Sequence, residues 1–308
     1  MPANRYAYAI LDVFTQHRFG GNPLAVIMDA RGLSSEQMQQ IAREFGFSET
    51  TFVLPTSEPS QFREVRIFTP ARELPFAGHP NIGTAFALAL DIEGADPEAV
   101  RALGNIVFEE KAGLVPISLR FGAQGPEYAE LRAPEAFEAI DSFSADDVAQ
   151  ALHLPNTAIR TARHQPTIAS VGLPFLFVEV SDLRALGNAF TTEERSRALF
   201  DSRDATGIFI YCLDSETGDN AIRARMFAPR TGVPEDPATG SACGALAGLL
   251  ASIDSKPDLQ QELSIAQGVE MGRPSLIHTR ALKSAGKVDA VYVGGSSVLF
   301  ATGFLQAS

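Results

Sequence analysis

Two similar segments, one in each half of the chain, end in residues that could bind a small anion and move a proton. The first contains Phe68 and ends in Gly78-His79-Pro80, and the second contains Phe227 and ends in Asp236-Pro-Ala-Thr-Gly240-Ser241. Each runs directly into an apolar stretch of helical length. A helix start offers free backbone N–H groups and the positive end of the helix dipole, so two such starts facing one cleft would form an anion site.

Glu49 is the candidate acid/base group. It stands directly before an apolar strand expected over 50–54, where partial burial would raise the pKa of its carboxyl group toward a range useful for proton transfer. The second half has Thr206 at the equivalent place, so the chemistry of Glu49 is expected on one side only. The alternative is a solvated loop carboxylate.

The other polar residues at the helix starts each allow a chemical and a structural interpretation. His79 could hydrogen-bond a substrate oxygen or carry a proton, because the pKa of imidazole lies near neutrality, or it could cap a helix. Asp236, as an ion, would be stabilised near a helix start and could be catalytic or only a cap. Ser241 is expected to be an N-cap whose N–H and hydroxyl can bind a carboxylate. Thr239 stands where the esterase nucleophile elbow requires Gly, which argues against a nucleophilic Ser241.

Corresponding residues recur in order at a slowly rising separation, which indicates two homologous halves. A capping box is also expected in each half, at Ser34-x-x-Gln37 and at Thr191-x-x-Glu194. Chance recurrence of Pro and Gly at turns is the alternative for any single pair, but ordered pairs with shared caps favour duplication. The pairs are Pro23 and Pro174 (separation 151), Phe52 and Phe209 (157), Phe68 and Phe227 (159), and Gly78 and Gly240 (162).

The fold predicted from these features is α/β, with a sheet wrapped around a buried helix in each half. The stretches 81–90 and 242–253 are apolar on nearly every face and should be buried all round. We place the first half at 1–127, completed by a terminal hairpin over 288–308, and the second at 128–287. The segment 121–134, which is rich in Gly and Pro, is expected to be the linker.

Composition narrows the class of protein. The chain has 308 residues, 45% of them hydrophobic, and a net charge of −12 without a basic cluster, which argues against nucleic acid as a partner. No apolar stretch is long enough to span a bilayer and no secretory leader is recognisable, so a cytoplasmic protein is expected. Five scattered histidines, two isolated cysteines and the absence of nucleotide-binding glycine motifs predict neither a metal nor a cofactor.

Several motifs along the chain resemble those of the phenazine-biosynthesis PhzF-like isomerases. This resemblance implies the diaminopimelate epimerase-like fold, a site in the cleft between two similar halves, and a homodimer that uses no cofactor. By position it implies that Glu49, His79, Asp236 and Ser241 are catalytic; we expect Gly78, Gly240, Asn22 and Arg273 to contact the substrate. The motifs are Asn22-Pro-Leu-Ala-Val, Ser48-Glu49-Thr-Thr-Phe, Phe76-Ala-Gly78-His79-Pro80, Glu235-Asp236-Pro-Ala-Thr-Gly240-Ser241-Ala and Gln267-Gly-Val-Glu-Met-Gly272-Arg273-Pro.

The expected reaction is a proton transfer between carbons of a small carboxylate, with trans-2,3-dihydro-3-hydroxyanthranilate as the first substrate to consider. Related epimerases of this fold use two thiols, whose positions are occupied here by Ala77 and Thr239, so two-thiol chemistry is disfavoured. Cys212 and Cys243 are expected to be inert core residues. The alternatives are an isomerase of another small acid and a non-catalytic carboxylate-binding protein.

Overall fold

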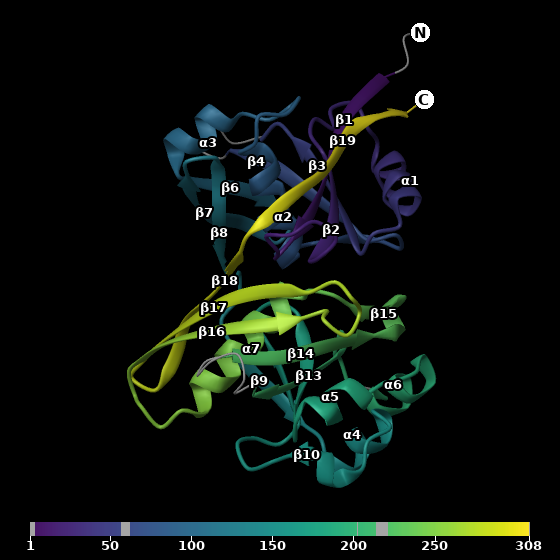
Figure 1. Cartoon of the computed structure of the whole chain (residues 1–308), viewed down its shortest axis with the longest axis vertical. Coiled ribbons are helices and arrows are strands. Elements are labelled where there is room, and N and C mark those ends of the chain that lie inside the picture. The colour runs from purple at the N-terminus through teal and green to yellow at the C-terminus, as the bar shows by residue number, and fades with distance from the viewer. Residues whose placement is uncertain (1–3, 57–61, 202, 214–220, 308) are drawn as a thin grey trace. The chain divides into compact units, whose positions relative to one another are not determined.

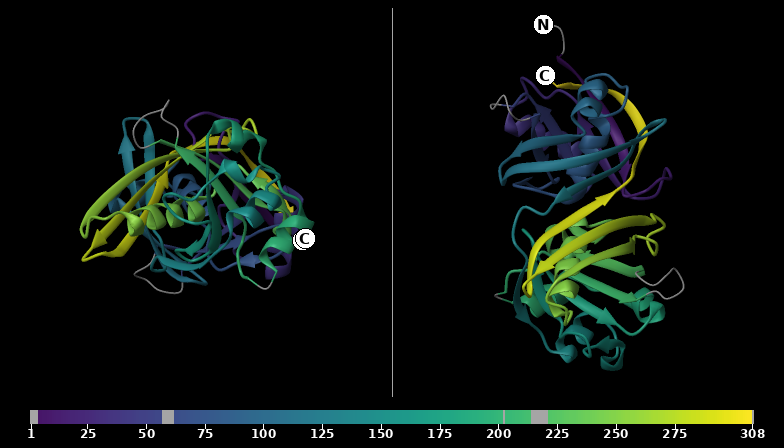
Figure 2. Two further views of the ribbon diagram at one scale, coloured as in Figure 1. Left: turned by 90° about the horizontal axis from the view of Figure 1, so that it is seen from below. Right: turned by 90° about the vertical axis from the view of Figure 1, so that its left-hand side faces the viewer.

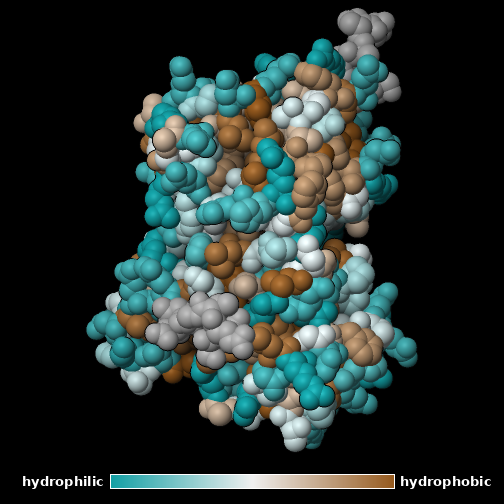
Figure 3. All heavy atoms as spheres, viewed as in Figure 1, coloured by the Kyte–Doolittle hydropathy of each residue, from teal (hydrophilic) through white to brown (hydrophobic). Residues whose placement is uncertain are grey.

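The computed structural model describes residues 4–56, 62–201, 203–213 and 221–307 (Figure 1). The chain divides into two compact units, Met1–Arg132 with Gly294–Ser308, and Ala133–Val293. Among the described residues, no helix combines the length and the apolar character needed to cross a membrane. Polar and hydrophobic side chains are mixed over the face seen in Figure 3.

The first unit is a mixed sheet in the order β19-β1-β2-β3-β4-β6-β7-β8, with the short β5 beside β4. The β2–β3 and β4–β6 pairs are parallel and the others antiparallel. Its strands are β1 (Asn4–Val13), β2 (Asn22–Ile27), β3 (Glu49–Leu54), β4 (Arg63–Phe68), β5 (Glu73–Leu74), β6 (Asn105–Glu110), β7 (Gly113–Gly122), β8 (Gly125–Arg132) and β19 (Ser297–Ala307), and its helices are α1 (Ser35–Phe45), α2 (Gly78–Leu88) and α3 (Pro97–Leu103).

The second unit repeats this arrangement in the order β9-β11-β12-β13-β14-β16-β17, with β15 beside β14 and β10 beside β12. Here β12–β13 and β14–β16 are the parallel pairs. Its strands are β9 (Glu138–Ser142), β10 (Ile159–Arg160), β11 (Thr167–Ser170), β12 (Pro174–Val180), β13 (Ile208–Leu213), β14 (Ala221–Ala228), β15 (Val233–Asp236), β16 (Leu259–Gln267), β17 (Ser275–Ser284) and β18 (Lys287–Gly295), which runs to the unit boundary; its helices are α4 (Ala145–Ala151), α5 (Leu183–Asn188), α6 (Glu193–Phe200) and α7 (Gly240–Ile253).

The two units therefore share one sequence of pairings, which confirms the prediction of two homologous α/β halves. The strand series β2, β3, β4, β5 and β6 of the first unit corresponds to β12, β13, β14, β15 and β16 of the second, with α2 and α7 inserted at the same point. Each of the four residue pairs recognised in the sequence falls on corresponding elements. Gly78 and Gly240, for example, are the first residues of α2 and α7.

A buried helix forms the centre of each unit, and strands curve around it (Figures 1 and 2). Every residue of α2 is buried, as are most residues of α7. Small residues make this possible, because strands can pack directly against the helix backbone. A Cβ atom added at Gly83 of α2 would lie 2.5 Å from Leu24 Cδ2 and 2.7 Å from Val13 Cγ2, so a side chain there would force β1 and β2 away.

Several local predictions can be compared with the structure. The Ser34–Gln37 capping box is present in full. The second capping prediction was wrong by one residue, because Thr192, not Thr191, is the N-cap of α6 and accepts from Arg195 N. Ser241 is not an N-cap, since Thr239 occupies that position.

Two segments differ from their predicted form. The predicted linker over 121–134 contains the end of β7, the tight turn of the antiparallel β7–β8 hairpin and the whole of β8. The terminal segment 288–308, expected to be a single hairpin, is divided at the unit boundary. β19 pairs with β1 in the first unit, while Lys287–Val293 of β18 belongs to the second.

Candidate functional site

Three of the predicted site residues meet at the start of α2. Asn22 and Glu49 are the first residues of β2 and β3, which are parallel neighbours, so both side chains emerge at the same edge of the sheet. His79, the second residue of α2, lies against them. Its Nδ1 is 3.4 Å from Asn22 Nδ2, and its Nε2 is 3.4 Å from Glu49 Oε2. Gly78 directly precedes His79 and begins the helix.

Burial controls the protonation of His79. The side chain is only 5% exposed, and desolvation lowers the pKa of His79 to about 3, so the ring is neutral near pH 7. We assign the proton to Nε2, because the Asn22 amide group can donate to Nδ1 only if that nitrogen carries no hydrogen. The Nε2–H then faces Glu49 Oε2 at 3.4 Å, a contact between a neutral ring and a carboxyl group that falls short of a formed hydrogen bond.

Glu49 combines a fixed orientation with limited access to solvent. Its side chain is 17% exposed, and Oε2 is buried against His79. His79 Nε2 lies against Oε2 on one side, while part of the carboxyl group remains accessible to solvent. A carboxylate in such a place can accept a proton from a bound molecule and return it.

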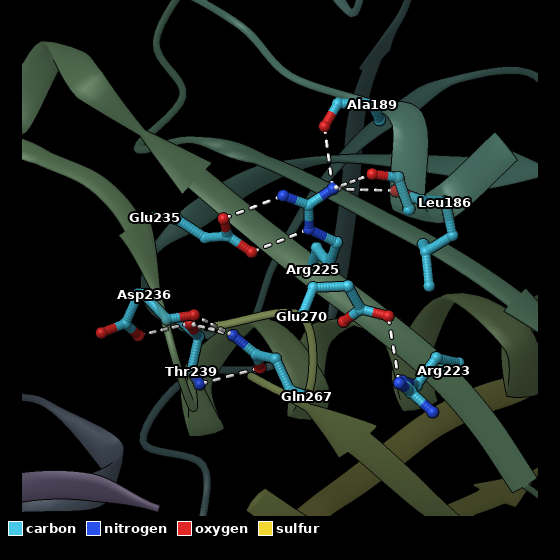
Figure 4. Close-up of polar contacts among 10 residues, drawn as sticks. Leu186, Ala189, Arg223, Arg225, Glu235, Asp236, Thr239, Gln267 and Glu270 are labelled. Atoms are coloured by element: carbon cyan, nitrogen blue, oxygen red, sulfur yellow. Dashed lines mark hydrogen bonds and ion pairs between the residues drawn. The ribbon is translucent and has the colours of Figure 1, made fainter. Parts of the chain in front are cut away.

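A second polar group surrounds the start of α7 in the other unit (Figure 4). Thr239 Oγ1 donates to Asp236 Oδ2 at 2.5 Å, and the amide of Gln267 closes the network. Gln267 Nε2 donates to Asp236 O (2.8 Å) and to Thr239 Oγ1 (3.0 Å), while its Oε1 accepts from Thr239 N (3.0 Å). Both Gln267 N–H groups are therefore used, and Thr239 directs its only hydroxyl proton to Asp236.

Gln267 was missed as a functional residue, although it stands in one of the motifs. It is fully buried at the end of β16, and a glutamine in that state must satisfy its donors and acceptor within the protein. The sequence carries one signal that indicates this place, namely the polar residue that ends an otherwise alternating strand before Gly268. What the sequence does not show is that this strand end lies under the start of α7.

The remaining predicted residues of the second unit lie near this network. Gly240 and Ser241 are the first two residues of α7, and Ser241 is half-buried. Arg273 lies in the turn after β16, where its N–H donates to Gly268 O at 2.9 Å and its carbonyl accepts from Ser275 Oγ at 3.1 Å. The Ser275 hydroxyl is also 2.9 Å from Pro237 O, which connects this turn to the loop before α7.

An ion pair supports the chain segment that carries Asp236. Arg225 of β14 binds Glu235 of β15 through two hydrogen bonds, Nε to Oε1 at 2.8 Å and Nη2 to Oε2 at 2.9 Å (Figure 4). Its Nη1 donates to the carbonyl groups of Leu186, Gly187 and Ala189 at the end of α5. Because Glu235 directly precedes Asp236, the pair fixes the entry to the α7 start.

The first unit repeats this ion pair. Arg66 of β4 binds Glu73 of β5 at 2.7 Å (Nε to Oε1) and 2.9 Å (Nη2 to Oε2). Arg66 and Arg225 are 159 residues apart, the separation of Phe68 and Phe227, and Glu73 and Glu235 are 162 apart, the separation of Gly78 and Gly240. The ion pair that supports the segment before the central helix is therefore present in both halves.

Neither cysteine is placed for catalysis by a thiolate. Cys212 and Cys243 are free and buried. Burial raises the pKa of the Cys243 thiol well above its ordinary value, and the nearby Asp236 carboxylate raises it further. Among the residues that the structure describes, no group of three or more His, Cys, Asp or Glu side chains is arranged to hold a metal ion.

Comparison with known proteins assigns the family. A family model described as "phenazine biosynthesis-like protein" matches residues 11–303, almost the whole chain. The chain belongs to the phenazine biosynthesis-like family. This membership confirms the resemblance found in the motifs, and members related to the chain are named isomerases.

Two relatives of this phenazine biosynthesis-like protein are similar to it from end to end. An uncharacterized isomerase of Mesorhizobium japonicum is 37% identical over 303 residues, covering 97% of this chain and 98% of the relative. The trans-2,3-dihydro-3-hydroxyanthranilate isomerase of Pseudomonas aeruginosa is 37% identical over 301 residues, with 97% and 98% coverage. The protein is an enzyme of the isomerase class.

Solved structures agree with the fold. A phenazine biosynthesis protein of the PhzF family from Bacillus anthracis superposes with a TM-score of 0.85 at 26% identity, covering 99% of this chain and all of that one. A predicted epimerase from Pseudomonas aeruginosa gives a TM-score of 0.76 at 29% identity, with 98% and 100% coverage. A hydroxyproline epimerase from Agrobacterium vitis shares the fold alone, with a TM-score of 0.60 at 13% identity over 99% of this chain and 92% of that one.

Proposed function

We propose that this phenazine biosynthesis-like protein is a cofactor-independent isomerase that moves a proton between two carbons of a small cyclic carboxylate. The first candidate substrate is trans-2,3-dihydro-3-hydroxyanthranilate, the substrate named for relatives that are 36–37% identical along nearly the whole chain. The observation that supports the proposal most directly is the Glu49 carboxyl group, which lies 3.4 Å from a neutral His79 beside the N-terminus of a buried helix.

In the proposed reaction Glu49 is first the base and then the acid. It removes a proton from one carbon, the electron pair of that C–H bond shifts to form a new double bond, and the displaced double bond takes the proton back from Glu49 at another carbon. No proton or electron is gained or lost overall. His79 points Nε2–H toward one carboxylate oxygen, and because the ring is neutral it adds no positive charge beside Glu49.

The helix starts supply the electrostatic part of the mechanism. Removing a proton beside a carboxylate builds negative charge on the substrate, and oriented N–H groups stabilise that charge more than the ground state. Each such donor contributes about 3–4 kcal/mol in favourable cases. The free N–H groups at Gly78 and His79 serve this role in the first unit, and those at Gly240 and Ser241 serve it in the second.

The second half-site has the chemistry for a supporting role. Asp236 is held by the Thr239 hydroxyl and can accept a hydrogen bond from an amino or hydroxyl group of the substrate. Ser241 can donate its hydroxyl to the substrate carboxylate, and Arg273 and Asn22 complete the set of polar groups proposed to contact the substrate.

The experiment is solvent exchange observed by NMR. In deuterated water the wild type should convert trans-2,3-dihydro-3-hydroxyanthranilate and introduce deuterium at carbon, while Glu49→Gln should do neither above background. Glu44→Gln is the matched control, because Glu44 is an exposed carboxylate of α1 only five residues away. Equal exchange by the wild type and Glu49→Gln would refute the role of Glu49.

An isomerase of another small acid is the second candidate, and relatives named only as uncharacterized isomerases favour keeping it. A panel of small unsaturated and cyclic carboxylates, followed by the same exchange signal, separates the two. Should every compound bind without exchange, the protein would be a carboxylate-binding member of the family. The expected homodimer is tested by light scattering of the purified protein.

A further inference from the structure

Glu110 is a buried carboxyl group for which the proposed reaction has no use. It is the last residue of β6 and follows the inward-facing positions Ile106 and Phe108, so the strand alternation directs it into the core of the first unit. The residue is 9% exposed. Neither of its carboxyl oxygens makes a well-formed hydrogen bond with the part of the chain that the structure describes.

Strand register shows that Glu110 corresponds to Gln267. In the first unit Glu64 of β4 is opposite Glu109 of β6, and in the second Arg223 of β14 is opposite Ala266 of β16. Glu64 and Arg223 are themselves counterparts, because each lies four residues before the Phe68 or Phe227 that the halves share. The next residue along each strand is therefore Glu110 in one unit and Gln267 in the other.

The central helices give the same correspondence independently. Asn81 of α2 and Cys243 of α7 are 162 residues apart, as Gly78 and Gly240 are. Cys243 Sγ is 3.8 Å from Gln267 Oε1. Asn81 is the side chain whose amide acts on the Glu110 carboxyl group, although without the geometry of a well-formed hydrogen bond, and its Nδ2 donates to Ala77 O at 3.0 Å. Each strand-end residue thus meets the first turn of its own helix at the same position.

Glu110 matches the shape and hydrogen-bonding groups of Gln267 only when its carboxyl group is protonated. Gln267 supports the α7 start with an uncharged group that donates and accepts. A carboxylic acid offers an O–H donor and a carbonyl acceptor in nearly the same geometry, whereas a carboxylate has no donor and carries a charge. Burial raises the pKa of Glu110 to about 8, with Asn81 opposing the shift, so the acid is the form present at neutral pH.

No charged neighbour accounts for this state. The elements packed against β6 carry Arg63, Glu64 and Arg66 on β4, Arg120 on β7, and Glu98 and Arg101 on α3. The other titratable groups of this region are His79 on α2, Glu73 on β5, and Glu109 and Lys111 adjacent in sequence. Lys111 and Arg66 are bound to Glu73, and Glu109 accepts a hydrogen bond from Thr56. The desolvated position itself keeps the proton on Glu110.

We propose that Glu110 is the positioning residue of the α2 half-site, a buried carboxylic acid that stands where Gln267 stands under α7 and that must remain uncharged for the α2 start to bind an anion. An ionised Glu110 would place a negative charge beneath the same helix start. It would compete with the substrate carboxylate for the positive end of the α2 dipole and repel it. This consequence for substrate binding rests on the proposed function, whereas the effect on the first unit does not.

Stability gives a test that needs no substrate. An unfolded Glu loses its proton near pH 4.3, so the native state binds the extra proton between about pH 5 and about pH 8 and stability falls across this range. Glu110→Gln, which copies the counterpart residue, should therefore gain Tm relative to the wild type as the pH rises from about 5 to about 8. Glu109→Gln, on the opposite face of the same strand, is the matched control and should not. A Tm difference between Glu110→Gln and wild type that stays constant with pH would overturn the proposal.

Substrate binding separates a positioning role from a merely structural one. Above about pH 8 the wild type should show a rising KM with a smaller change in kcat, and Glu110→Gln should delay that rise. Binding of benzoate, a ring carboxylate without a reactive C–H, should likewise weaken above about pH 8 in the wild type and less so in Glu110→Gln. The reciprocal variant Gln267→Glu should show a loss of Tm at alkaline pH that the wild type lacks at this position.

The two proposals can fail separately. If the wild type isomerises no carboxylate, the proposed function fails, while the Tm and benzoate measurements still decide the role of Glu110. Identical benzoate profiles for wild type and Glu110→Gln would contradict the positioning role of Glu110.

Discussion

Arg225 and Glu235 face each other as planar groups joined by two parallel hydrogen bonds, with exposed side-chain fractions of only 10% and 18%. Arg225 has three further acceptors at the end of α5, so its charge is fully surrounded by partners. Such a pair contributes little beyond a well-packed apolar substitute, but removing one partner leaves a charge in a desolvated place.

Glu235→Gln is therefore expected to destabilise the protein by about 3–5 kcal/mol, because it leaves the Arg225 charge without its carboxylate. Urea unfolding monitored by circular dichroism measures the loss. The control is Glu193→Gln, which breaks an exposed helical pair with Arg197 and should cost less than about 1 kcal/mol. Equal losses of unfolding free energy for the two variants would show that the buried Arg225 pair contributes no more than the exposed one.

The counterpart pair in the first unit should respond to acid. Burial would raise the pKa of Glu73, but hydrogen bonds from Arg66 and Lys111 outweigh it and lower the pKa. The stabilisation is therefore complete above the pKa of an unfolded Glu and is lost as the pH falls through the lower, folded value. Glu73→Gln should be less stable than wild type at neutral pH, and the difference should shrink in acid. A difference that grows in acid would contradict this sign.

His79 should be neutral, with its proton on Nε2, throughout the neutral range. Because its folded pKa is about 3 while an unfolded His has a pKa near 6.5, stability should fall as the pH drops from about 6.5 toward 3. Nitrogen-15 NMR of histidine-labelled protein reports both the charge and the tautomer directly. A doubly protonated His79 ring at neutral pH would mean that the Glu49 contact is an ion pair, and the proposed mechanism would need a different base.

The two thiols should react only when the protein unfolds. Cys212 and Cys243 are 1% and 0% exposed, and the raised pKa of the Cys243 thiol leaves little of it as thiolate. Iodoacetamide should label neither residue in the native protein and both in urea, as mass spectrometry will show. Cys243→Ala should retain the isomerase activity within a few-fold, since the thiol takes no part in the proposed proton transfer. Loss of deuterium exchange in this variant would indicate that the Cys243 thiol takes part in the proton transfer.

The sequence predicted the architecture well because the duplicated residues lie at the starts of helices and in core strands. Gly78 and Gly240 mark the helix starts, and Phe68 and Phe227 mark the strands that precede them, so fold class and internal symmetry follow from local signals. The pairing of β19 with β1 could not be predicted, because an alternating strand does not specify which strand it will pair with.

The site was only partly accessible to sequence reasoning for a related reason. Glu49, Asn22 and His79 stand in separate motifs, and their contact depends on the parallel pairing of β2 with β3 under the start of α2. Gln267 and Glu110 were overlooked because a polar residue at a strand end usually faces solvent. Only the register of β16 and β6 reveals that both are buried beneath a helix.

Strand β19 makes the two units respond differently to the loss of one strand. It pairs with β1 over ten residue pairs, so the first unit is assembled from two separated stretches, while the second is one uninterrupted stretch, Ala133–Val293. A chain cut before Ser297 would lose the whole partner of one β1 edge, while the strands of the second unit would keep theirs. Limited proteolysis of such a truncated chain should therefore leave the second unit intact and cleave the first.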